Sequence, residues 1–213
     1  MNVAYNVDCM EYMRTLPEKA FDLAVVDPPC GISINHNMGR RKGDKPSEYK
    51  KVTWDSKPPE KEYFDELFRV SRNQIVWGAN YFQMPPTKCF IVWRKPQISE
   101  DVSFSMVEYA WASFDQTAKE WIGMSAEADR IHPTQKPIAL YTWIFSRYAK
   151  PGDKILDTHL GSGSSRIAAY NAGLDFVGCE IDKDYFDAQE KRFQEHTAQE
   201  NLFLQMEMLE GME

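Results

Sequence analysis

The chain has 213 residues, of which 43% are hydrophobic and 27% charged, as in an ordinary globular protein with one substantial core. Its net charge of −7 argues mildly against nucleic-acid binding, although a local basic patch would be compatible with it. No apolar run reaches membrane-spanning length, and the N-terminus lacks the regions of a signal peptide. We therefore expect a cytoplasmic protein without membrane contact.

The four cysteines are Cys9, Cys30, Cys89 and Cys179. They lie far apart, and none forms a CxxC or Cys/His pair with the spacing of zinc ligands. We predict no metal site, and we expect free thiols in a reducing compartment.

The first part of the chain is predicted to form a strand, a helix and a second strand. Asp8 follows the opening strand, and the apolar run 21–26 is typical of a buried parallel strand. That run ends in a turn made of Asp27, Pro28, Pro29 and Cys30. Two adjacent prolines cannot continue a central strand, so the chain leaves the sheet there.

Residues 31–60 are polar and contain several glycines and prolines, which predicts a long, mobile loop of a kind that usually carries function. Basic residues crowd into it, among them Arg40, Arg41 and Lys42. On composition alone, a solvated loop is the favoured interpretation, and a patch that contacts nucleic acid is the alternative.

The remaining elements alternate between strands and helices. A helix is expected over 60–71, strands over 74–79, 89–93 and 107–113, a helix over 138–149, a strand over 154–157, a helix to about 172, a strand over 175–181 and a helix over 184–196. This alternation predicts an α/β fold with a doubly wound, mostly parallel sheet covered by helices on both faces. No domain boundary is visible, so we expect a single domain over 1–213.

A glycine-rich turn follows the strand that ends at Asp157. Gly161 and Gly163 would let the backbone approach a ligand, and Glu180, about 20 residues further on, could accept hydrogen bonds from both ribose hydroxyls. Asp157 would repel a pyrophosphate but not the ammonium of a methionine group, which favours S-adenosylmethionine over a dinucleotide. The alternative is a structural turn with a surface glutamate.

Asp27 also stands at the carboxyl end of a strand, so both sites can meet at one edge of the sheet. An exocyclic amino group is a weak nucleophile because its lone pair is delocalised into the ring. If Asp27 accepts one N–H and the carbonyl of Pro28 accepts the other, the nitrogen becomes pyramidal and can attack a methyl sulfonium. The alternative is a strand-ending turn whose aspartate binds local amides.

Four motifs occur in order: DPPC at 27–30, HPTQKP at 132–137, DTHLGSGSS at 157–165 and GCE at 178–180. Together they resemble the beta class of DNA amino-methyltransferases, the N-4/N-6 DNA methylase family, in which the catalytic motif precedes the cofactor motif. The resemblance is weak over about 97–130. It implies a Rossmann-like S-adenosylmethionine-dependent methyltransferase fold with circularly permuted motif order, here in a small solo or phage-type member of a family that serves restriction-modification systems.

The resemblance also implies roles for individual residues. The residues expected to bind S-adenosylmethionine are Asp157, His159, Gly161, Gly163, Glu180, His132, Thr134 and Lys136. The catalytic residues would be Asp27, Pro28, Pro29 and Cys30, and those that face the substrate would be Asp8, Trp54, Arg40, Arg41 and Lys42. The expected partner is double-stranded DNA with the target base flipped out of the helix.

The sequence departs from the family pattern at two positions. Cys30 replaces the usual aromatic that stacks on the flipped base. Either Trp54, Trp77 or Tyr81 supplies the ring instead, or the base is held weakly. His159 stands in a motif that usually reads D-P-F, and a tolerated substitution is the simpler interpretation. A Pro-Cys nucleophile for methylation of cytosine carbon is disfavoured, because enzymes of that kind have the opposite motif order.

An aspartate before the two prolines favours adenine as the target base. The segment 97–131 is too short for a large target-recognition domain, which predicts a short or relaxed target sequence or a homodimer that shares recognition. The alternatives are a cytosine amino-methyltransferase, an RNA or protein-amide methyltransferase, and an inactive S-adenosylmethionine-binding protein associated with DNA.

Overall fold

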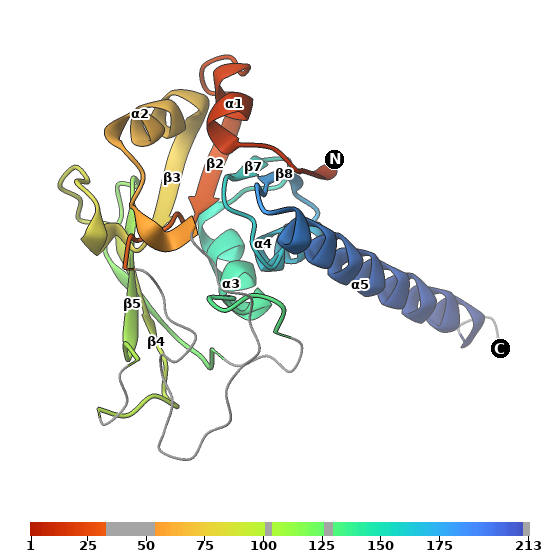
Figure 1. The fold of residues 1–213 in the computed structure, drawn as a ribbon. Helices are drawn as coiled ribbons and strands as arrows, with labels where there is room; N and C mark the ends of the chain where they lie inside the picture. Colours follow the sequence, from red (N-terminus) through yellow and green to blue (C-terminus); the bar gives the residue numbers. More distant parts are fainter. Residues whose placement is uncertain (33–53, 101–103, 126–129, 211–213) are drawn as a thin grey trace.

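The computed structural model describes residues 1–32, 54–100, 104–125 and 130–210 (Figure 1). Its strands form an eight-stranded sheet with the order β1-β8-β7-β2-β3-β5-β4-β6. The strands are β1 (Asn2–Tyr5), β2 (Phe21–Val26), β3 (Ser71–Trp77), β4 (Phe90–Arg94), β5 (Val107–Ala112), β6 (Lys119–Ile122), β7 (Lys154–Asp157) and β8 (Asp175–Cys179). The helices are α1 (Cys9–Arg14), α2 (Lys61–Val70), α3 (Ile138–Tyr148), α4 (Ser164–Asn171) and α5 (Lys183–Glu210), with short 3-10 turns η1 (Trp54–Ser56) and η2 (Ala79–Tyr81).

The pairing of the strands divides the sheet into two parts. From β1 through β8, β7 and β2 to β3, every neighbouring pair is parallel. β5 is then antiparallel to both β3 and β4, and β6 is parallel to β4. The predicted doubly wound, mostly parallel α/β fold is therefore confirmed, with one inverted strand that the sequence did not reveal.

The apolar run of β2 is buried on both faces, because alternate side chains enter two different cores. Leu23 and Val25 lie in the core cluster that α3 and α4 cover. Ala24 and Val26 lie in the cluster that α1 and α2 cover. Helices on both faces thus fix the direction of β2, and with it the place where the chain leaves the sheet at Asp27.

Two elements differ from the prediction. The strand β6 was missed because its sequence, KEWI, carries two charged residues and places only Trp121 partly inside. The last helix continues to Glu210, well beyond the expected end at 196, and projects away from the sheet (Figure 1). Most of the loop predicted over 31–60 lies outside the described residues. Within the described ranges, no helix has both the length and the apolar character needed to cross a bilayer.

Candidate active site

A cleft of about 210 Å³ opens where the parallel strands β2, β7 and β8 end. Residues that follow these three strands converge there, as expected for an open α/β sheet. The lining residues that come from the four sequence motifs are Asp27, Pro29, His132, Thr134, Gln135, Lys136, Thr158, His159, Leu160, Gly161, Ser162 and Glu180. Motifs that are far apart in the sequence therefore share one cavity.

The glycine-rich turn between β7 and α4 depends on two left-handed residues. Gly161 has a φ of +51° and Gly163 a φ of +73°, a region that other residues rarely adopt. A Cβ on Gly163 would also lie 3.2 Å from the side chain of Gln189. The turn therefore requires glycine for its own geometry and brings its backbone to the wall of the cleft.

Glu180 ties this turn to the end of β8. Its Oε2 accepts the backbone N–H of Gly161 at 2.8 Å, and its Oε1 accepts that of Asp182 at 2.9 Å. A carboxylate offers about four lone-pair sites, so acceptor capacity remains for a ligand in the cleft. Burial raises the pKa of the Glu180 carboxyl, and the two amides oppose that shift.

Asp157 has a different place from the one its predicted role suggests. It is 2% exposed and does not line the cleft. Its oxygens accept the N–H of His159 at 3.0 Å and the hydroxyl of Ser165 at 2.5 Å. Burial raises the pKa of Asp157 to about 7. It therefore acts on the cleft by holding the turn that forms its wall.

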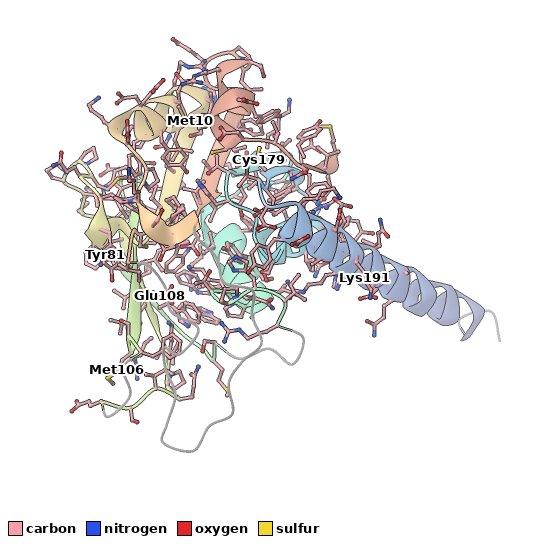
Figure 2. The ribbon with its side chains drawn as sticks, in the orientation of Figure 1. Met10, Tyr81, Met106, Glu108, Cys179 and Lys191 are labelled. Atoms are coloured by element: carbon pink, nitrogen blue, oxygen red, sulfur yellow. The ribbon has the colours of Figure 1, made fainter. Side chains whose placement is uncertain are left out.

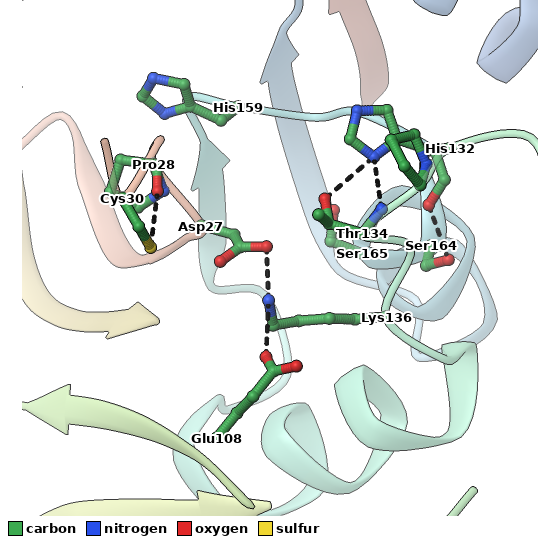
Figure 3. Close-up of polar contacts among 12 residues, drawn as sticks. Asp27, Pro28, Cys30, Glu108, His132, Thr134, Lys136, His159, Ser164 and Ser165 are labelled. Atoms are coloured by element: carbon green, nitrogen blue, oxygen red, sulfur yellow. Dashed lines mark hydrogen bonds and ion pairs between the residues drawn. The ribbon is translucent and has the colours of Figure 1, made fainter. Parts of the chain in front are cut away.

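Asp27, at the end of β2, lies in a chain of four alternating charges, three of which, Asp27, Lys136 and Glu108, are seen in Figure 3. Its Oδ2 contacts the ammonium of Lys136, which lies 3.2 Å from Oε2 of Glu108. Oε1 of Glu108 in turn contacts the ammonium of Lys95. We call these four residues the charge chain. Sequence reasoning identified Asp27 and placed Lys136 near the cofactor, but it missed Glu108 and Lys95.

His132 and Thr134 form a second wall of the cleft. The N–H of Thr134 donates to Nδ1 of His132 at 3.3 Å, and the His132 ring packs edge-on against Tyr185 with centroids 4.4 Å apart. Burial lowers the pKa of His132 to about 3, so the imidazole is neutral. This wall therefore presents polar but uncharged groups.

His159 belongs to a buried hydrogen-bond network. Oγ1 of Thr158 lies 2.9 Å from Nδ1 of His159 and 2.6 Å from the hydroxyl of Tyr63. The Tyr63 and His159 rings also pack against each other, with centroids 5.4 Å apart. Burial lowers the pKa of His159 to about 4. A neutral ring therefore stands where the family usually has phenylalanine.

Cys30 does not line the cleft and packs against Gly78. A Cβ on Gly78 would lie 2.6 Å from Sγ of Cys30, so the two residues fit closely. Burial raises the pKa of the Cys30 thiol to about 12, and the charge of Asp27 adds to that shift. A protonated thiol outside the cleft is a poor candidate for a nucleophile. Pro28 is buried beside it and does not line the cleft either.

The predicted substrate-facing residues are only partly described. Asp8 lines the cleft and caps α1, where its Oδ1 accepts the N–H of Met10 at 2.7 Å. Trp54 begins η1, but its side chain lies outside the described residues. Arg40, Arg41 and Lys42 lie entirely outside the described residues. Of the other two aromatics considered, Trp77 is fully buried and Tyr81 is half exposed, and neither lines the cleft.

Two curated proteins resemble this chain along most of its length. A putative methylase, YubD, of Escherichia coli strain K12 is 24% identical over 207 residues, which cover 87% of each chain. The type II methyltransferase M.HinfI of Haemophilus influenzae is 22% identical over 254 residues, which cover 92% of this chain and 69% of the relative.

Solved structures show the same fold at low identity. The M1.HpyAVI–SAM complex has a TM-score of 0.60 at 19% identity and covers 90% of this chain and 98% of that one. TTHA0409, a putative DNA modification methylase from Thermus thermophilus complexed with S-adenosyl-L-methionine, has a TM-score of 0.61 at 17% identity, with coverage of 92% and 94%. The cytosine-N4-specific PvuII DNA methyltransferase has a TM-score of 0.61 at 15% identity, with coverage of 93% and 91%.

The family model described as DNA methylase matches residues 47–191, which is more than half of the chain. The match includes three of the four motifs, and the cleft joins the fourth, at Asp27, to them. The chain therefore belongs to the N6/N4 DNA methylase family.

Proposed function

We propose that this protein is an active DNA methyltransferase that transfers the methyl group of S-adenosylmethionine to the exocyclic amino group of adenine. The observation that carries the proposal is the single cleft in which Asp27 and Pro29 lie together with Gly161 and Glu180. An amine held at one end could therefore meet a methyl donor held at the other. Membership of the family supports DNA as the substrate, and two solved relatives in complex with S-adenosylmethionine support the cofactor.

The residues of the cleft fit this cofactor. Glu180 would accept hydrogen bonds from the ribose hydroxyls, and the backbone at Gly161 would leave room beside it. The neutral His132 and Thr134 would line the methionine end. When bound, S-adenosylmethionine supplies an electrophilic methyl group whose carbon–sulfur bond breaks as the amine attacks.

The proposed roles of the chain at the other end concern the amine. Oδ2 of Asp27 is occupied by Lys136, which leaves Oδ1 to accept one N–H of the target amine. The proposed acceptor for the other N–H is the carbonyl of Pro28. It lies outside the cleft lining in this structure, so the entering base would have to displace its weak contact with Sγ of Cys30 at 3.9 Å. These two acceptors would direct the nitrogen lone pair and stabilise its developing positive charge, and Asp27 would then take the proton directly or through water.

The proposal also covers the identity of the target base, its removal from the duplex and the recognition of the target sequence. The aspartate that opens the DPPC motif favours adenine, while a relative of the same fold is cytosine-N4-specific, so cytosine is the competing target. An amine inside a duplex cannot reach Asp27, so we propose that the base is flipped out. The short segment 97–131 supports a short target sequence or recognition shared in a homodimer, which light scattering with and without DNA would test.

The deciding experiment incubates the purified protein with tritiated S-adenosylmethionine and unmethylated genomic DNA, followed by mass spectrometry of the nucleosides. We expect labelled N-methyladenine with the wild type and none with Asp27→Ala. Asp115→Ala is the matched control, because Asp115 is an exposed aspartate that pairs with Lys88 at the surface. Label in amino-methylcytosine would reassign the base. Cofactor binding without labelled DNA would contradict the proposal and direct attention to RNA or to an inactive binding protein.

A further inference from the structure

Glu108 occupies a position of β5 where the sheet otherwise buries apolar side chains. It shares one face of β5 with Ala110 and Ala112, which are fully buried in the core cluster under α3. In the register of β4 and β5 it lies opposite Trp93, a member of the same cluster. Figure 2 shows Glu108 toward the centre of the molecule, whereas Met106 lies at the outer end of the strand. The side chain of Glu108 is 31% exposed, so its charge is partly removed from water, which is costly unless neighbouring charges compensate it.

Two lysines compensate this charge, and both are held in place. The side chains of Lys136 and Lys95 are 5% and 7% exposed, and each ammonium contacts a carboxylate oxygen of Glu108. Each ammonium also lies over an indole ring, Lys136 at 5.3 Å from Trp77 and Lys95 at 4.7 Å from Trp93. The position of the Lys136 ammonium is therefore fixed by Glu108 and by the indole ring of Trp77 on β3.

The same Lys136 ammonium also contacts the carboxylate of Asp27. Figure 3 shows the carboxylates of Asp27 and Glu108 on opposite sides of the Lys136 nitrogen. Glu108 thus holds the ammonium that occupies Oδ2 of Asp27, while Oδ1 is not part of this contact. An error of about 1 Å in the placement of a catalytic group can cost about 100-fold in rate, so this support would matter to the reaction.

The charge of Glu108 matters as well as its position. Burial opposes ionisation of Glu108, but Lys136 and Lys95 outweigh that effect and lower its pKa, so the group is ionised. With Glu108 ionised, the four groups of the charge chain carry two negative and two positive charges and no net charge. Without this carboxylate, the two buried ammonium groups would lack the anion that lies between them.

We propose that Glu108 is a positioning residue for methyl transfer, which holds Lys136 against Oδ2 of Asp27 and so fixes the carboxylate that receives the target amine. This inference rests on the proposed function. It assigns a role to a residue outside the four motifs, on a strand that shares none of them.

Kinetics with S-adenosylmethionine and duplex DNA would test the proposal in three variants. Glu108→Ala is expected to lower kcat about 100-fold and to change the KM for DNA little, because Asp27 is misplaced. Glu108→Gln should lose less, since its amide oxygen can still accept from Lys136. Glu120→Gln, which alters an exposed glutamate of β6 paired with Arg94 of β4, should match the wild type. Affinity for S-adenosylhomocysteine should be unchanged in all three, and circular dichroism would verify folding.

A second measurement, the pKa of Asp27, does not depend on methyl transfer. Carbon NMR of the Asp27 carboxyl in cofactor-free protein, assigned with Asp27→Asn, reports its pKa directly. The charged or titratable groups that influence Asp27 are Lys136, Glu108, Lys95, Asp157, Cys30 and Tyr141. If Glu108 holds Lys136 in place, Glu108→Ala frees the ammonium and raises the pKa of Asp27. If it acts only through space, loss of its negative charge lowers that pKa.

The outcomes separate this inference from the proposed function. A wild type that methylates no DNA would overturn the proposed function, and the titration of Asp27 would still decide whether Glu108 positions Lys136. An active wild type whose Glu108→Ala variant keeps its kcat would overturn the positioning role. An unchanged or lowered pKa of Asp27 in that variant would do the same. A raised pKa together with a loss confined to kcat would support it.

Discussion

The two ends of the cleft are stabilised in different ways. At the end formed by β7, α4 and β8, the carboxylates of Asp157 and Glu180 are satisfied by backbone N–H groups and one hydroxyl, all within 19 positions of each carboxylate. At the end formed by β2, Asp27 is satisfied by Lys136, which is 109 positions away, and Lys136 by Glu108 on a third segment. One end is built from local backbone, the other from distant side chains.

This difference predicts different responses to mutation. A carboxylate that binds backbone amides is fixed by the path of the chain, so its neighbours can change without moving it. A carboxylate held by a lysine depends on every side chain that holds that lysine. Changes at the first end should therefore act on cofactor affinity, and changes at the second end on the rate of transfer.

The largest effect is expected from Asp27→Asn. The variant keeps the shape of the side chain but loses the charge that stabilises the developing ammonium, so kcat should fall about 100- to 1,000-fold. Binding of S-adenosylhomocysteine, measured by calorimetry, should stay at the wild-type level because Asp27 lies at the other end of the cleft. Equal losses in binding and in rate would mean that the two ends are not separable.

Glu180→Gln should show the opposite pattern. Its amide group cannot accept both the Gly161 and Asp182 N–H groups, and it cannot accept two ribose hydroxyls as a carboxylate would. We expect the Kd for S-adenosylmethionine to rise about 10- to 100-fold, as for lost hydrogen bonds to a charged group. The rate at saturating cofactor should change far less. Glu195→Gln, which alters an exposed residue of α5, is the control. An equal rise in its Kd would show that the effect of Glu180→Gln does not arise in the cleft.

The end of the cleft formed by β7, α4 and β8 is also the one that the sequence predicted well. The strand that ends at Asp157, the two glycines and Glu180 all lie within a single strand–helix–strand unit. Periodicity and spacing suffice for such a unit because its geometry follows from a few neighbouring residues. Even here, the sequence could not tell that Asp157 holds the turn from behind rather than lining the cleft.

The end of the cleft at Asp27, formed by β2, could be predicted only in part. The DPPC motif located Asp27, and the segment 107–113 was correctly predicted as a strand. Yet Glu108 joins the site only because β5 runs antiparallel to β3 and β4, and neither the direction nor the register of that strand is encoded in its own hydrophobic pattern. A charged residue in line with two buried alanines was the available signal, and only the pairing of the strands gives it meaning.

The smallest expected effect concerns His159, which also lines the cleft and replaces the family's phenylalanine. Its pKa of about 4 in the folded protein lies below the ordinary value of 6.5, so the folded state binds fewer protons than the unfolded state between these values. Stability contributed by the neutral ring is therefore present above pH 6.5 and is lost as the pH falls toward 4. His159→Phe removes that loss.

Thermal unfolding of the wild type and His159→Phe across this pH range would measure the effect. The variant should gain about 1–2 kcal/mol on the wild type at the acid end. It should keep its methyl-transfer rate, because Thr158 retains its hydrogen bond to Tyr63. Some acid sensitivity should remain, since His132 is also buried with a lowered pKa. A constant difference between the two proteins at every pH would instead mean that the exchange alters packing alone, and His159 would then be an ordinary part of the wall between the two ends.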